Sequence, residues 1–71
     1  MTTKDFKQAA GKIIRADGAR MVDFNPVMET MANIIAVRNH GVHRYTAYIN
    51  EYVDGEPVVE VYYEGVCLLR K

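Results

Sequence analysis

Apolar residues near the start of the chain recur at intervals of three and four, which is the spacing of one face of an α-helix. This face consists of Phe6, Ala9, Ala10, Ile13 and Ile14. Asp5 lies in the first turn, where a negative charge complements the helix dipole, and Gly18 suits the left-handed position that follows a helix end. The pattern predicts a helix over residues 3–16.

The next segment predicts a link and a second helix. Residues 20–24 form the link, and Pro26 suits the first turn of a helix because its missing N–H is not needed there. The apolar stripe of this helix is Val27, Met31, Ile34 and Ile35. We expect the helix over residues 26–38, ended by Asn39-His40-Gly41. For the earlier segment, a hairpin over residues 12–24 is the alternative to a helix followed by a link.

From Val42 onward, β-branched and aromatic residues alternate with polar residues, which is typical of strands. We expect strands over residues 42–53, 57–63 and 66–70, with turns at Asp54-Gly55 and Glu64-Gly65. The expected fold class is α+β: two N-terminal helices packed on one face of a three-stranded antiparallel meander. Residues 1–71 form a single small domain.

The first of these turns allows two registers, which place opposite sets of side chains on the core face. A two-residue loop at Asp54-Gly55 pairs Ile49 with Glu60 and mixes apolar with charged residues on both faces. A type I turn with Gly55 as a bulge pairs Ile49 with Val59 instead. The second register also pairs Ala47 with Val61, Tyr45 with Tyr63 and Arg44 with Glu64. We prefer it because it produces one coherent apolar face.

In that register the other face of the sheet is open and rich in tyrosine. Tyr45 and Tyr63 then belong to the core, whereas three further tyrosines point outward beside Val58. Tyrosines at a surface supply a large contact area with few rotatable bonds, which is why protein interfaces are enriched in them. We therefore predict a partner-binding surface made of Tyr48, Tyr52, Tyr62, Arg44, Asn50, Glu60, Glu64 and Leu69.

Composition and charge narrow the class of protein. The 71 residues are 49% hydrophobic and 25% charged, which is typical of a globular domain and not of a disordered chain. Nine Lys and Arg balance nine Asp and Glu, which argues against a protein that coats nucleic acid or an acidic membrane. The balance conceals a polarity: residues 1–44 hold seven basic and four acidic residues, and residues 45–71 hold two and five.

No arrangement of residues predicts catalysis or cofactor binding. His40 and His43 have a spacing that a metal site can use, but a third ligand is not evident, so we predict no metal. Cys67 is the only cysteine, which excludes an internal disulfide and favours a reducing, cytoplasmic location. The chain contains no phosphate-binding loop, nucleophile elbow or zinc-protease motif. We expect neither an enzyme nor a cofactor-binding protein.

These observations predict a small protein-binding inhibitor or accessory factor. We take the chain as a complete short gene product of the kind that phages encode, acting on a host protein complex as anti-CRISPR proteins do. A nucleic-acid-binding regulator is the alternative, and a structural domain that forms oligomers is the third candidate. Strand 42–53 is an edge of the expected meander, so we also expect either a homodimer that pairs two copies of it or a partner strand docked there. No apolar run is long enough for a membrane span.

Overall fold

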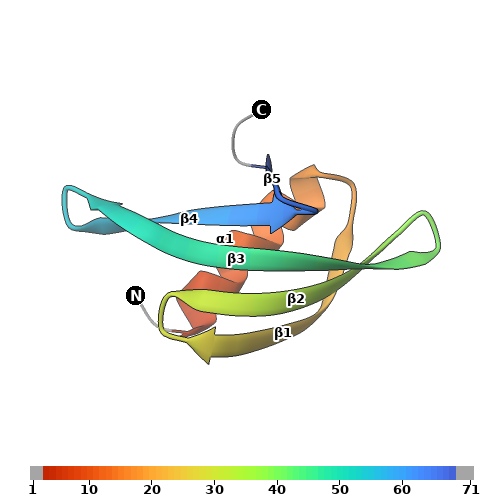
Figure 1. The fold of residues 1–71 in the computed structure, drawn as a ribbon, viewed down its shortest axis with the longest axis horizontal. Helices are drawn as coiled ribbons and strands as arrows, with labels where there is room; N and C mark the ends of the chain where they lie inside the picture. Colours follow the sequence, from red (N-terminus) through yellow and green to blue (C-terminus); the bar gives the residue numbers. More distant parts are fainter. Residues whose placement is uncertain (1–2, 69–71) are drawn as a thin grey trace.

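One helix covers a five-stranded antiparallel sheet in the computed structural model, which describes residues 3–68 except for the side chains of Asn50, Glu51 and Cys67 (Figure 1). The sheet is a meander in which each strand pairs with the next along the chain. Its elements are helix α1 (Thr3–Ala16) and strands β1 (Arg20–Met28), β2 (Met31–Arg38), β3 (Gly41–Val53), β4 (Glu56–Tyr63) and β5 (Val66–Cys67). The helix lies behind the sheet in Figure 1, so the opposite face is turned to the viewer.

The predicted first helix is confirmed, including its end. Gly18 has a φ of 86°, and its N–H donates to the carbonyl oxygen of Arg15 at 3.0 Å. The Ala19 N–H donates to the carbonyl oxygen of Ile14 at 3.1 Å. These two bonds form a Schellman motif, which satisfies carbonyl groups that the helix leaves unpaired. The alternative hairpin over residues 12–24 is therefore wrong.

The predicted second helix and the three-stranded meander are also wrong. Residues 20–28, expected as a link and the start of a helix, form β1, and most of the remaining helix forms β2. A short continuous apolar run such as residues 34–37 fits a helix or a buried strand equally well, and tertiary pairing decides between them. Here β2 pairs with β3 from Met31–Tyr48 to Arg38–Gly41, so the run becomes a strand inside the sheet. The fold contains one helix and five strands among the described residues.

A tight turn with positive φ angles connects β2 to β3 at the point where the predicted helix was expected to end. Asn39 and His40 have φ angles of 52° and 65°, and they connect the paired residues Arg38 and Gly41. Two successive left-handed residues form a type I′ turn, which matches the twist of a hairpin. The segment Asn39-His40-Gly41 also suits the end of a helix, because asparagine and glycine are common both at helix ends and in hairpin turns.

The register of β3 against β4 has the predicted parity, but a different structural feature produces it. Ile49 pairs with Val59 and Ala47 with Val61, as predicted. However, the turn is the two-residue loop at Asp54-Gly55, with φ angles of 52° and 80°. The extra residue is Asn50, where the register shifts between Ile49 and Glu51. A β-bulge at Asn50 therefore supplies the change of parity that we had assigned to the turn.

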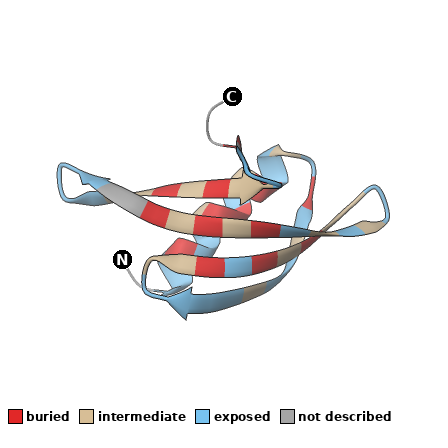
Figure 2. Ribbon diagram, viewed as in Figure 1, coloured by how far each residue is buried: buried red, intermediate tan, exposed pale blue. Residues whose placement is uncertain are grey.

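The core lies between α1 and the sheet, and buried positions alternate with intermediate or exposed ones along β2, β3 and β4 (Figure 2). Ala10 of the helix faces alanines of the sheet that are fully buried, namely Ala32, Ala36 and Ala47. Phe6 packs edge to face on Phe24, with ring centroids 5.4 Å apart. The larger buried residues include Ile14, Ile34, Tyr45 and Val61.

Across residues 3–68, no helix has both the length and the apolar character that crossing a membrane requires.

Candidate functional site

The face of the sheet that α1 leaves uncovered carries a pair of packed tyrosines. Tyr48 of β3 and Tyr62 of β4 lie edge to face, with centroids 5.5 Å apart and an interplanar angle of 86°. The Tyr62 hydroxyl donates a hydrogen bond to Oε1 of Glu60 at 3.0 Å. All three side chains are half-buried although no element of the described chain covers this face. Packing against one another therefore holds the two rings in a defined orientation.

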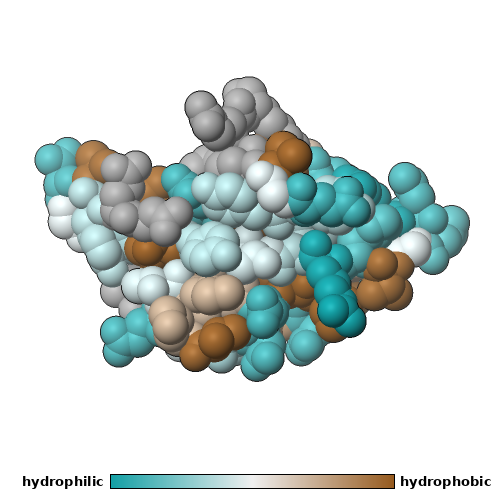
Figure 3. Space-filling model, in the orientation of Figure 1, coloured by the Kyte–Doolittle hydropathy of each residue, from teal (hydrophilic) through white to brown (hydrophobic). Residues whose placement is uncertain are grey.

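A hollow of about 280 Å³ lies beside this pair, over β2 and β3. Asn33 and Ile35 of β2 line it together with Arg44 and Thr46 of β3. The register pairs Ile35 with Arg44 and Asn33 with Thr46, so the four residues occupy two adjacent rows of the open face. Figure 3 shows pale surface at the centre of this face, with brown, hydrophobic patches and teal, hydrophilic side chains interspersed around it. We call the surface formed by Asn33, Ile35, Arg44, Thr46, Tyr48, Val58, Glu60 and Tyr62 the open face.

Several residues predicted for this surface lie elsewhere. Tyr52 pairs with Pro57 beyond the bulge, so it belongs to the helix side of the sheet, where it lines a cavity with Ile49. The bulge at Asn50 reverses the facing of the strand between Tyr48 and Tyr52, and the sequence prediction did not include it. Glu64 is exposed in the β4–β5 turn, with a φ of 51°. The predicted pairing of Arg44 with Glu64 is absent from the described register, where Arg44 pairs with Ile35.

Two of the predicted site residues have side chains that the structure does not describe. Asn50 occupies the bulge, and its side chain lies outside the described part of the structure, as does the whole of Leu69. The strand expected over residues 66–70 is described only as Val66–Cys67. Tyr63 pairs with Val66 across a two-residue turn, as predicted.

The dimer through strand 42–53 was predicted because this strand was expected at an edge of the sheet, and the structure places it elsewhere. That strand is β3, the middle strand of five, and it pairs with β2 through Tyr48 and with β4 from Thr46 onward. Since its backbone groups already bond within the sheet, it offers no continuous edge to a second copy or to a partner strand. The outer strand β1 is interrupted by bulges next to Val22 and Val27 and contains Pro26, which are features that discourage pairing with another chain.

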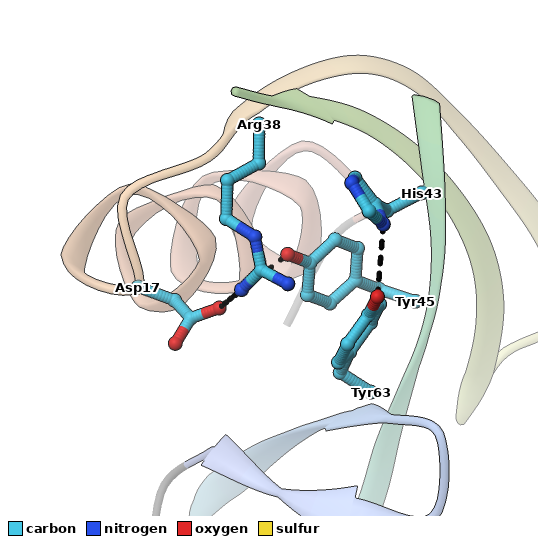
Figure 4. Close-up of polar contacts among 5 residues, drawn as sticks. All are labelled: Asp17, Arg38, His43, Tyr45 and Tyr63. Carbon is cyan, nitrogen blue, oxygen red and sulfur yellow. Dashed lines mark hydrogen bonds and ion pairs between the residues drawn. The ribbon is translucent and has the colours of Figure 1, made fainter. Parts of the chain in front are cut away.

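A polar cluster joins the end of α1 to the sheet (Figure 4). The Arg38 guanidinium lies 2.9 Å from Oδ2 of Asp17, and the Tyr45 hydroxyl donates to the same oxygen at 3.4 Å. Tyr45 is only 2% exposed, and burial is the main cause that raises the pKa of its phenol. The Arg38 charge opposes this shift, whereas the negative charge of Asp17 adds to it.

Tyr63 and His43 complete the cluster. Nδ1 of His43 and the Tyr63 hydroxyl are hydrogen-bonded at 2.8 Å, and the Arg38 guanidinium lies 4.8 Å above the centre of the Tyr63 ring. The Tyr63 ring also contacts the Tyr45 ring, with centroids 4.9 Å apart. As predicted, Tyr45 belongs to the core and Tyr63 packs against it. These contacts connect the residue after α1 with β2, β3 and β4.

Sequence reasoning missed the roles of Asp17, Arg38 and His43. A signal for them was present in the period of two that runs through Ala32, Ile34 and Ala36, because its next member is Arg38. Interpreting this segment as a helix hid that signal. Among the residues described, no three His, Cys, Asp or Glu side chains gather closely enough to hold a metal ion.

Comparison with protein-family models, with curated proteins and with solved structures finds no match for this chain.

Proposed function

We propose that this chain is a non-enzymatic protein-binding inhibitor or accessory factor, and that its open face is the surface that contacts the partner. The observation that carries the proposal is the edge-to-face pair of Tyr48 and Tyr62 on a sheet face that the helix leaves uncovered. Tyrosine is among the residues that contribute most binding energy in protein interfaces. Since the two rings already hold one orientation, ordering them on binding would cost this chain little conformational entropy.

The surroundings of the tyrosines favour a protein as the partner. Ile35 and Val58 supply apolar area on the same face as the rings, while Arg44 and Glu60 supply charges of both signs. An apolar centre with charged residues around it is typical of specific protein interfaces. Glu60 beside Tyr62 would repel the phosphates of a nucleic acid whose bases stacked on these rings. A host defence complex, of the kind that anti-CRISPR proteins bind, is one partner class that the proposal includes.

The experiment compares alanine variants of tyrosines on the two sides of the sheet. Tyr48→Ala and Tyr62→Ala should each weaken partner binding by about 2 kcal/mol or more while the chain stays folded. Tyr45→Ala should instead cost about 3 kcal/mol or more of stability, because its ring is buried. Affinity capture from bacterial lysate identifies the partner, and calorimetry with the purified partner measures the affinity of each variant.

Tyr52→Ala is the matched control, since Tyr52 is 61% exposed but lies on the helix side of the sheet. The partner should bind this variant as tightly as the unmodified chain. Equal loss of binding in the Tyr52 and Tyr62 variants would contradict the proposal. So would retention of random DNA at low salt that disappears steeply as salt rises, because this behaviour is typical of the nucleic-acid-binding alternative.

A further inference from the structure

A basic groove runs along the outer side of α1 next to the start of β1. Its volume is about 750 Å³, and residues of α1 and β1 line it. Four cations belong to the lining, against one carboxylate, that of Asp5: Lys4, Lys7, Lys12 and Arg15. Ala9 and Met21 contribute apolar surface to the same groove. An occupant should therefore present carboxylates together with apolar side chains.

The opposite combination of side chains occurs at the tip of the β3–β4 hairpin. Tyr52 and Val53 are 61% and 53% exposed there, and the exposed residues Asp54 and Glu56 flank Gly55 in the turn. This tip projects at one end of the long axis, beyond the helix in Figure 1. The acidic tip, residues 52–56, thus matches the basic groove in charge and in apolar content.

We infer that the basic groove is a binding site for the acidic tip of a second copy of this chain. The two surfaces lie on different parts of the molecule, so the contact is head-to-tail, and a single contact leaves one copy with a free groove and the other copy with a free tip. Contacts of this kind close into rings, of which a reciprocal dimer is the smallest, or continue as open chains. The formal net charge of zero favours such association, because the copies do not repel one another over long distances.

A second copy fits the groove better than a phosphate backbone does. Phosphate contacts need cations but gain nothing from the apolar surface of Ala9 and Met21. Within the groove lining, no aromatic ring is present on which a base could stack. The acidic tip uses both properties of the groove, since it combines two carboxylates with an exposed tyrosine and an exposed valine.

The first experiment follows molar mass by light scattering over a series of protein concentrations. At about 0.02 M salt the average mass should rise at least twofold above that of the monomer as concentration increases. At about 0.5 M salt the monomer should return, because the attraction between surface charges is then screened. A strict monomer at low salt, or association that salt does not weaken, would overturn the inference.

The second experiment separates the two surfaces with neutral variants. The groove variant carries Lys7→Gln and Lys12→Gln, and the tip variant carries Asp54→Asn and Glu56→Gln. Asparagine tolerates the positive φ of residue 54, and glutamine is a good helix former, so both variants should fold. Each alone should stay monomeric, and an equal mixture should form one-to-one dimers, because one intact tip meets one intact groove.

The outcome of the mixture decides the geometry. Failure to form mixed dimers from two folded monomeric variants would overturn head-to-tail binding. Arg44→Gln removes an exposed cation from the open face and should leave association unchanged, which shows that the position of the charge matters and not the net charge alone. If the unmodified chain stays monomeric but binds heparin through Lys7 and Lys12, the groove takes a polyanion and the inference is wrong.

Discussion

The Arg38 guanidinium binds the Asp17 carboxylate at 2.9 Å and so connects strand β2 to the residue directly after helix α1. Asp17 lies where the negative end of the helix dipole makes a further negative charge unfavourable. Arg38 offsets that charge and also lies over the Tyr63 ring. The Arg38 side chain thus contacts both the end of the helix and the aromatic edge of the core. The stability of the fold should therefore depend on Arg38.

Removing Arg38 should therefore cost more than removing the charge of Asp17. We expect Arg38→Met to lower the free energy of unfolding by about 2 kcal/mol, because it leaves a half-buried carboxylate at the end of the helix and removes the contact with Tyr63. Asp17→Asn should cost about 1 kcal/mol, since relief at the helix end partly compensates for the lost ion pair. Urea denaturation of the two single variants and the double variant measures the coupling, and a larger loss for Asp17→Asn would contradict this account.

Alkaline pH should destabilise the fold through Tyr45. Burial raises the pKa of this phenol above its ordinary value of 10.0 in the folded chain, so the folded state holds the proton more tightly than the unfolded state. The contribution of the protonated Tyr45 phenol to the free energy of unfolding is fully present below pH 10. It is lost as pH rises through the pKa of the phenol in the folded chain. Melting curves from pH 8 to pH 11 should show a decline that is weaker in Tyr45→Phe. An identical decline in both proteins would show that other groups cause it.

The β2–β3 turn should be improved by glycine. His40 has a φ of 65°, a conformation that is costly for a residue with a Cβ atom and free of that cost for glycine. His40→Gly creates an Asn-Gly turn, which is the sequence that type I′ hairpins prefer. We expect a gain of about 0.5–1 kcal/mol in the free energy of unfolding. Gly55→Ala, at a φ of 80° in the next turn, should lose stability, and a loss in both variants would contradict the proposed strain.

Gly11 offers a second stabilising substitution. It lies inside α1, where glycine is less favourable than alanine by about 1 kcal/mol. An added Cβ atom would lie 3.3 Å from Cε of Met21, the flexible end of a side chain that can move by a few tenths of an ångström. We expect Gly11→Ala to raise the melting temperature. A lower melting temperature that Met21→Ala reverses in the double variant would show instead that the contact with Met21 is too tight.

The sequence predicted most reliably those features that depend on neighbouring residues. The helix over residues 3–16 and its end at Gly18 follow from local spacing and from one left-handed residue. The pairing of Ile49 with Val59 was predicted because only one parity keeps charged residues out of the core. The segment 26–38 failed because its apolar residues fit two periods, and Asn39 and His40 serve a helix end as well as a hairpin turn.

For the open face, the sequence alone determined that Tyr48 and Tyr62 share a side, because only the register that keeps charged residues out of the core places both of them there. Only the tertiary structure decided that β2 is a strand, that Arg38 reaches Asp17 and that Tyr52 belongs to the helix side. A bulge such as the one at Asn50 changes the facing of every residue beyond it, yet it costs so little locally that packing across the sheet selects its position. Likewise, whether residues 31–38 form a helix or a strand depends on the free backbone groups of β3, which lie outside the segment itself.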